Sequence, residues 1–307
     1  MDKIKIKDSS IFSTHFDYCK KQIFNYKKGK FKNKISDEEL SRLIRLKPKK
    51  MEERRKNESK YNALLSSELD DAERREIEQM FRDIYKKFSG SKSGWGAYAF
   101  LEKLDITVCP YCNENYIYRI LNKKKSPEKP DITIRADLDH FYSKNKFGLF
   151  ALSLYNLVPS CKTCNSSIKG SVNFKEDIRA INPYAEAMDE YVTFRREPNN
   201  IDNAVDILLG YSKEFEFKSE SKSIIDGDRA EYMLDFFGVI ERYNHQHKEY
   251  IQRQVRREVH YNDEYKEKMK TYLETLDLST DLSEGLTIND QSLGKLMNDC
   301  FKEISDF

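Results

Sequence analysis

The chain has 307 residues, a mass of 36.4 kDa and a formal net charge of +2, a length that suits about two domains of ~150 residues each. Hydrophobic residues make up 38% and aromatic residues 12% of the sequence, which excludes a disordered chain. A charged fraction of 35%, a mean hydropathy of -0.79 and interrupted apolar runs exclude a membrane-protein class. Because residues 1–10 contain no apolar signal core, we expect a cytoplasmic protein.

Charge is unevenly distributed along the chain. Residues 1–60 carry 19 Lys and Arg against 9 acids, residues 109–170 carry 10 against 5, and residues 171–307 carry 18 against 29. A basic first half is typical of proteins that bind polyanions, because lysine and arginine neutralise phosphates and release counterions. A Lys-rich helix face exposed to solvent gives the same excess of basic residues. The basic charge of residues 20–60 therefore has two interpretations: a nucleic-acid contact or a solvated face.

Residues 1–106 are predicted to form a basic, helical N-terminal region. Ser36 and Glu39 have the spacing of a capping box, which predicts a helix that ends before Pro48. Apolar residues at three- and four-residue steps predict an amphipathic helix over residues 66–88. Its apolar stripe consists of Ile77, Met80, Phe81, Ile84, Tyr85 and Phe88.

A short helix over residues 97–104 is expected to lead into a different kind of region, residues 107–185. Short β-type runs over residues 117–121 and 132–138 predict strands there, separated by a Lys- and Pro-rich surface loop at residues 122–130.

Residues 186–307 are expected to be acidic and mainly helical, with a helical block over residues 229–276. The predicted fold class is therefore α+β, a small mixed unit between two mainly helical regions. His245 and His247 lie two positions apart within this block, so we interpret them as surface residues.

Four cysteines form the clearest motif of the chain. Cys109 and Cys112 make one CxxC pair, Cys161 and Cys164 make a second, and 48 residues separate the pairs. Two such pairs supply the four thiolate corners of a closed, structural zinc site, and the intervening length suggests a folded insert.

Other readings of the cysteines are less compatible with the sequence. Disulfides form in an oxidising compartment, and we see no signal peptide that would direct the chain to one. A redox function would need only one CxxC pair, whereas this chain has two. Cys19 and Cys300 lie far from the cluster in sequence, and we interpret both as free thiols.

The insert also carries polar residues suited to hydrolytic chemistry. Oxygen ligands such as Asp139 and Asn165 suit Mg²⁺, and His140 has an intrinsic pKa near ~6.5 that lets it accept a proton from water. Together they have the groups needed for metal-assisted phosphodiester hydrolysis. Taken singly, His140 could be a satisfied structural histidine, Asn156 a turn residue and Asn165 a helix N-cap.

The order CxxC, Asp-His, Asn, CxxC-Asn resembles the HNH endonucleases of the ββα-metal class. The run DLDHFYSKNKFGLFALSLYNLVPSCKTCNSSIKG is especially similar to the zinc-containing nuclease subunits of bacterial anti-phage systems of the Septu type and their retron-associated relatives. The resemblance covers residues 108–184 and implies a small, zinc-stabilised ββα-metal unit within residues 107–185.

The resemblance implies a role for each signature residue. Asp139 would bind a catalytic Mg²⁺ or Mn²⁺, and His140 would be the general base. Asn156 would hold the loop that orients His140, and Asn165 would be the second protein ligand of the ion. Because adjacent side chains of a regular strand point to opposite faces, the chain must bend at Asp139 and His140 for both to reach one ion.

Two positions depart from the family's pattern. Ser143 stands where close relatives often have proline, and the basic residue that often follows the third signature position is Lys169, after Ile168. Proximity in sequence suggests these phosphate contacts: Tyr142, Lys144, Lys146 and Lys169.

The predicted function is a metal-dependent endonuclease that hydrolyses DNA, with structural zinc, acting as the nuclease effector of a bacterial anti-phage defence system. The alternative is a zinc-stabilised nucleic-acid-binding module that does not cut, for which Asp139 and His140 would be unnecessary. The helical flanks would suit docking of a partner ATPase, by analogy with the family alone.

Overall fold

The structure of the chain is a computed structural model. It describes residues 1–66, 68–122, 132–175, 177–222, 226–260, 265, 267–268 and 291–305. Two compact units make up the fold: an N-terminal unit of residues 2–111 and 115–187, and a C-terminal unit of Met1, residues 112–114 and residues 188–307. Within the described ranges, no helix combines the length and apolar character that crossing a membrane requires.

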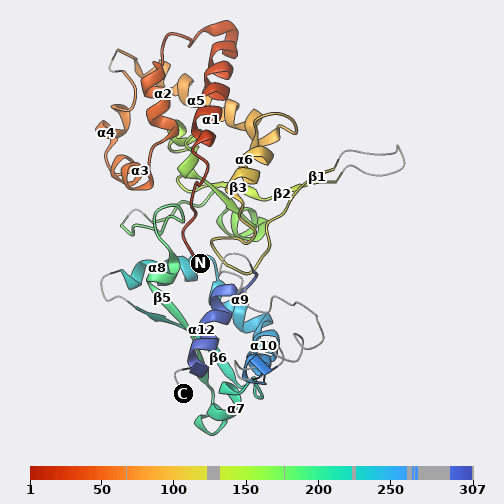
Figure 1. The fold of residues 1–307 in the computed structure, drawn as a ribbon. Coiled ribbons are helices and arrows are strands. Elements are labelled where there is room, and N and C mark those ends of the chain that lie inside the picture. Colours follow the sequence, from red (N-terminus) through yellow and green to blue (C-terminus); the bar gives the residue numbers. More distant parts are fainter. Residues whose placement is uncertain are drawn as a thin grey trace. The chain divides into compact units, whose positions relative to one another are not determined.

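Six described helices precede the cysteine region and belong to the N-terminal unit (Figure 1). They are α1 (Ser10–Asn25), α2 (Asp37–Ile44), α3 (Pro48–Arg55), α4 (Glu58–Asn62), α5 (Asp71–Gly90) and α6 (Ala97–Leu104). The predicted helix over 97–104 is confirmed at both ends, and α5 begins at residue 71 rather than 66.

Helix starts in this unit follow the capping rules. Ser36 Oγ accepts from the Glu39 N–H while the Glu39 carboxylate accepts from the Ser36 N–H, so the predicted capping box of α2 is confirmed. The predicted end of this helix before Pro48 is confirmed, since α2 ends at Ile44. Pro48 is itself the first residue of α3, where a missing N–H costs no helical hydrogen bond.

The apolar stripe of α5 forms the centre of the N-terminal unit. All six predicted stripe residues are buried, as the spacing predicts. Helices α1 and α6 contact α5, and α1 also contacts α2. Buried residues of α1 include His15 and Cys19.

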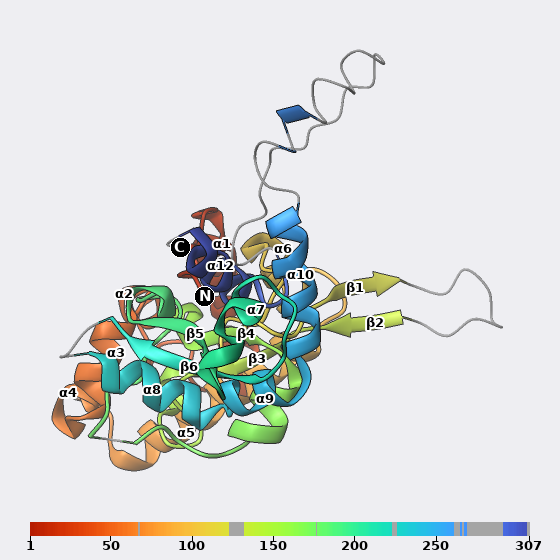
Figure 2. The same cartoon turned by 90° about the horizontal axis from the view of Figure 1, so that it is seen from below.

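Four strands of the N-terminal unit form two separate antiparallel pairs. The first pair joins β1 (Arg119–Asn122) to β2 (Ile132–Arg135), which lie side by side in Figures 1 and 2. The second joins β3 (Asp137–His140) to β4 (Leu157–Ser160), with Asp139 opposite Val158 and His140 opposite Leu157. The predicted strand at 117–121 overlaps β1, and the predicted strand at 132–138 overlaps both β2 and β3. The predicted loop at 122–130 lies almost wholly outside the described residues.

The segment between β3 and β4 packs against the N-terminal helices. Its short 3-10 helix at Gly148–Phe150 contacts α5 and α2, and Leu149, Phe150 and Leu152 are buried. A further 3-10 helix lies at Leu154–Asn156. After β4, a short helix of the wide π type at Thr163–Lys169 contacts β3. The insert between the cysteine pairs is thus folded, as predicted, and it shares a core with the helices.

The C-terminal unit combines helices with a strand pair. Its described elements are β5 (Val192–Pro198), α7 (Ala204–Leu208), β6 (Phe215–Ser221), α8 (Gly227–Phe236), α9 (Val239–Gln246), α10 (Lys248–His260) and α12 (Gly294–Ser305). The prediction of a mainly helical region missed the seven-residue antiparallel pair of β5 and β6. The predicted helical block at 229–276 is three helices as far as residue 260, and most of its remainder lies outside the described residues.

Buried ion pairs tie α12 into the C-terminal unit. The Lys295 ammonium lies 2.7 Å from carboxylate oxygens of both Asp189 and Asp299, and the Arg196 guanidinium on β5 donates to Glu303 at 2.7 Å. Each charge is compensated, as burial of a charge requires.

Residues 112–114 are held by the helices of this same unit. His247 is half-buried, not the surface residue we predicted, because its Nε2 lies 3.0 Å from the Glu114 carboxylate. His245 is exposed, as predicted.

The α+β class is confirmed, since helices and small antiparallel strand pairs occur together in the described residues. The predicted division into 1–106, 107–185 and 186–307 stays a prediction. The residues of its first two regions lie largely in one compact unit.

Candidate functional site

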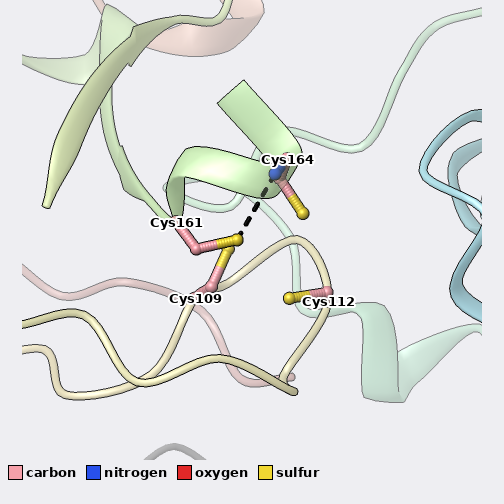
Figure 3. Close-up of side chains that lie close together, drawn as sticks. All are labelled: Cys109, Cys112, Cys161 and Cys164. Atoms are coloured by element: carbon pink, nitrogen blue, oxygen red, sulfur yellow. Dashed lines mark hydrogen bonds between the residues drawn. The ribbon is translucent and has the colours of Figure 1, made fainter. Parts of the chain in front are cut away.

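The four cysteines of the CxxC pairs come together in one buried cluster. Their sulfur atoms all lie within 4.8 Å of one another. Figure 3 shows Cys109 and Cys112 on one loop, and Cys161 and Cys164 at the start of the π-helix, with their side chains gathered at one place. A tetrahedral site with Zn–S bonds of ~2.3 Å places its sulfurs about 3.8 Å apart. The cluster could therefore hold a metal such as zinc.

Local hydrogen bonds shape both cysteine loops. In the first loop, the Cys109 N–H donates to the carbonyl of Asn115 at 3.0 Å, and Asn113 takes a left-handed turn with φ 51°, which asparagine tolerates. In the second loop, the Cys164 N–H donates to Cys161 Sγ at 3.4 Å, the dashed line of Figure 3. An N–H directed at sulfur favours the thiolate form that binds metal.

The six cysteines all lie in described residues and form no disulfide in the structure, so the disulfide reading is not realised. Cys19 and Cys300 are buried outside the cluster, and burial raises the pKa of each thiol above its usual range. They are uncharged and unreactive at neutral pH, in line with their interpretation as free thiols.

Asp139 and His140 are the last two residues of β3 and line one cavity. The cavity has a volume of about 430 Å³ and lies within the N-terminal unit. Most of its lining is polar and comes from β3, the loop after it and the π-helix: Asp139, His140, Ser143, Lys144, Asn145, Asn165, Ser166, Lys169 and Ser171. Neighbouring side chains at the end of β3 thus reach the same cavity, as the predicted role of the pair requires.

His140 is a buried, neutral imidazole with one nitrogen committed. Its Nε2 lies 3.1 Å from the Ala151 carbonyl oxygen, which can only accept, so Nε2 carries the proton. The Tyr85 ring packs edge-on against the imidazole with centroids 4.2 Å apart. Burial, reinforced by the charge of Lys144, lowers the pKa of His140 to about 3. The ring is therefore uncharged at neutral pH, with Nδ1 as its basic atom.

Asn156 fixes the loop that contains Ala151, whose carbonyl accepts the hydrogen bond from His140. Its amide Nδ2 donates to the carbonyls of Tyr142 at 2.9 Å and Phe150 at 3.1 Å, while its Oδ1 accepts from the Tyr142 N–H at 2.8 Å. These bonds close the loop directly before Ala151. The side chain is fully buried, so Asn156 is placed to set the orientation of His140 indirectly.

Both carboxylate oxygens of Asp139 have protein partners. Lys169 Nζ lies 2.6 Å from Oδ1, and the Tyr111 hydroxyl donates to Oδ2 at 2.7 Å. Burial and the charge of Asp139 raise the pKa of Tyr111 well above its usual range, so this hydroxyl remains a donor. Lys169 also donates to the His140 carbonyl at 2.7 Å.

Asn165 lies at the first turn of the π-helix and contacts the start of β3. Its Nδ2 donates to Asp137 Oδ2 at 3.0 Å, and the neighbouring Ser166 hydroxyl donates to the same oxygen at 3.0 Å. Asn165 is half-buried and lines the cavity with Asp139. The structure thus brings the four predicted residues, with Asn156 behind the loop, to one region of the N-terminal unit.

The donor chemistry around Asp139 fits a divalent cation. Carboxylate and carboxamide oxygens are ligands of the kind that Mg²⁺ and Mn²⁺ prefer, and Asp139 and Asn165 both face the cavity. The ammonium of Lys169 at Asp139 Oδ1 supplies the positive charge that a buried carboxylate needs.

The predicted phosphate contacts differ in their availability. Tyr142 is buried and its hydroxyl donates to Glu52 at 2.9 Å, so that prediction is wrong. Lys169 is 3% exposed and is bound to Asp139, so it does not reach an incoming phosphate in this arrangement. Lys144 lines the cavity, and Lys146 lies exposed on the same loop.

Sequence reasoning missed three contributors to the site: Tyr111, Tyr85 and Asp137. Tyr111 lies inside the first CxxC pair, where its position between two predicted zinc ligands was the available signal. Asp137 precedes Asp139 by two residues and shares its strand face. Tyr85 belongs to the α5 stripe, where an aromatic residue at helical spacing predicts only packing.

Comparison with known proteins finds no protein family, no curated protein and no solved structure that matches this chain.

Proposed function

We propose that the chain is a phosphodiester hydrolase of the HNH endonuclease type, acting on DNA. The observation that supports it best is the state of His140, a neutral imidazole at the wall of a polar cavity whose Nε2 is occupied by the Ala151 carbonyl. A merely structural histidine does not require a carboxylate beside it and a polar cavity that is also lined by a lysine, Lys144.

The proposed proton transfer uses His140 Nδ1. This atom takes a proton from water as the oxygen attacks phosphorus, and the bond from Nε2–H to the Ala151 carbonyl stabilises the imidazolium that forms. Tyr85 packs against the ring and keeps it from turning. Lys144, half-buried at the cavity wall, would attract the phosphodiester and offset the charge that builds on its oxygens.

A divalent ion would be held by Asp139 and Asn165 when it binds. It would supply Lewis-acid stabilisation of the phosphorane and of the leaving oxygen. Metal in the four-cysteine cluster would have a different, structural role, because four thiolates leave no open coordination position.

The choice of DNA and of an anti-phage role rests on the resemblance of residues 108–184 to zinc-containing HNH subunits. The excess of basic residues in 1–60 and 109–170 supports a polyanionic substrate. Control by a partner ATPase belongs to the same proposal.

The test is a cleavage assay with the full, zinc-loaded chain. Supercoiled plasmid, single-stranded DNA and single-stranded RNA are incubated separately with Mg²⁺, with Mn²⁺ and with EDTA, and zinc content is measured in every sample. We expect nicked or linear plasmid with Mg²⁺ or Mn²⁺ and none with EDTA under conditions in which zinc is retained.

The same assay separates the alternative. Binding is followed by the mobility shift of each substrate in the same samples. Binding without cutting, by zinc-loaded protein with either ion and also after a candidate partner ATPase has been added, would contradict the hydrolase and leave the binding module. Cutting of RNA alone would support phosphodiester hydrolysis but contradict DNA as the substrate.

A further inference from the structure

Lys169 is a buried lysine whose ammonium group contacts other residues of the site. Its side chain and that of Asp139 are each 4% exposed, and Nζ lies 2.6 Å from Asp139 Oδ1 and 2.7 Å from the His140 carbonyl oxygen. The Phe174 ring covers the ammonium at 5.3 Å. An isolated buried charge is costly, so each member of this pair depends on the other unless another charge replaces it.

The π-helix delivers Lys169 to this position. Its backbone closes with a bond from the Gly170 N–H to the Asn165 carbonyl at 2.7 Å, a step of five residues rather than four. Gly170 then leaves the helix with φ 49°, a conformation that favours glycine. Wide π turns occur frequently at functional sites, and this one places the lysine at the end of the helix that begins beside Asn165.

We propose that Lys169 is a tethered cation that competes with a divalent ion for Asp139, so that the resting site binds the ion weakly until Lys169 leaves. This inference rests on the proposed function, because it concerns the ion of that same site. An ion at Oδ1 would lie within a few ångströms of the ammonium, and like charges at that separation disfavour each other. Tyr111 is a neutral donor at Oδ2 and can stay in place.

Substrate provides a reason for Lys169 to move. The residue lines the cavity, so a phosphodiester entering there offers the ammonium a second anion. Lys169 would then pair with phosphate while Asp139 becomes available to the ion. The two bindings would favour each other, as thermodynamic linkage requires when both displace the same contact.

Direct binding of Mn²⁺ tests the competition without any cleavage. Full-length, zinc-loaded wild type, Lys169→Met and Lys146→Met are titrated with Mn²⁺, and free Mn²⁺ is followed by electron paramagnetic resonance. Methionine keeps the length and the contact with Phe174 but removes the charge. Lys146→Met removes one charge from an exposed lysine that lies over the Phe147 ring.

We expect Lys169→Met to bind Mn²⁺ at least about tenfold more tightly than wild type and Lys146→Met to stay within about twofold. Equal or weaker binding by Lys169→Met would overturn the proposal. A gain that survives in the double variant Lys169→Met with Asp139→Asn would overturn it as well, since the ion would then lie elsewhere. Zinc content and circular dichroism verify folding, and Lys169→Gln replaces Lys169→Met if the latter is unfolded.

The two experiments distinguish failure of this inference from failure of the hydrolase proposal. Tighter Mn²⁺ binding without cleavage of any substrate would keep the competition and remove the nuclease. Cleavage by wild type, together with unchanged Mn²⁺ affinity in Lys169→Met, would support the nuclease and contradict the competition.

Discussion

At the scale of single residues, the site consists of polar groups that hold one another in place. His140 donates to the Ala151 carbonyl, and His15 on α1 has its Nε2 at 3.0 Å from the adjacent Leu152 carbonyl. The Trp95 indole N–H donates to the other nitrogen of His15 at 3.0 Å. Two neutral imidazoles therefore fix consecutive peptide groups beside the cavity.

Replacing Asn156 by alanine tests the support of this loop. The change leaves two buried carbonyls and one N–H without their partner, so we expect unfolding free energy to fall by about 3 kcal/mol and cleavage to fall with it. Chemical denaturation and plasmid cleavage measure the two effects. Asn33→Ala, at an exposed position, is the matched control, and an Asn156→Ala protein as stable as this control would contradict the assignment.

His15 predicts a pH dependence of stability. Burial lowers the pKa of His15 from 6.5 to about 4, so the unfolded chain binds the extra proton first, and stability falls as the pH drops below about 6.5 toward 4. Protonation of His15 Nδ1 would also break its hydrogen bond with Trp95, because two N–H donors would then face each other. The loss from this group is about 2 kcal/mol between pH 7 and pH 5.

The comparison that isolates this contribution is wild type against His15→Gln, which removes the titrating group. Urea denaturation at both pH values should show a shallower pH slope for the variant, because His140 is unchanged in both proteins. Equal slopes would show that His15 does not titrate in this way.

At the scale of secondary structure, the sequence signals that succeeded were local. The capping box at Ser36 and Glu39 and the stripe of α5 depend on spacing alone, and both are confirmed. The spacing of the CxxC pairs predicted that they assemble, because two such pairs supply the four thiolates of one tetrahedral metal site.

Signals that failed were of two kinds. The alternation of apolar residues in Val192–Pro198 and Phe215–Ser221 has the period of a strand and could have predicted β5 and β6, but the long helical pattern after residue 229 dominated the interpretation. The pair of Lys169 and Asp139 joins residues 30 apart through a π turn. No periodicity predicts such a turn.

Metal in the cysteine cluster is expected to stabilise the loops more than the whole insert. Because the segment between β3 and β4 packs on α5 and α2, we expect chelation of zinc to loosen the cysteine loops and lower Tm without unfolding the insert. Elemental analysis should find about one zinc per chain.

Cys161→Ser is the direct variant for this prediction, and Cys300→Ala, a buried cysteine outside the cluster, is its control. Zinc should be lost in the first and kept in the second. A Cys161→Ser protein with full zinc content and unchanged Tm would contradict the metal site.

At the scale of the whole molecule, the charge distribution predicts how nucleic acid binds. Residues 1–60 and 109–170 are basic and residues 171–307 are acidic. An interface in which four lysines or arginines neutralise phosphates should lose affinity by roughly 100-fold between about 50 mM and 200 mM salt. Fluorescence anisotropy with labelled duplex measures this slope, and an affinity independent of salt would exclude an electrostatic interface.

The most direct measurement of the central claim compares cleavage rates of wild type, His140→Ala and His245→Ala, all zinc-loaded and folded. His245 is an exposed histidine of α9 and controls for removal of an imidazole. Loss of a general base predicts a decrease of about 10²- to 10⁴-fold for His140→Ala and wild-type rates for His245→Ala. A His140→Ala protein that cuts as fast as wild type would contradict the assignment of His140 as the base.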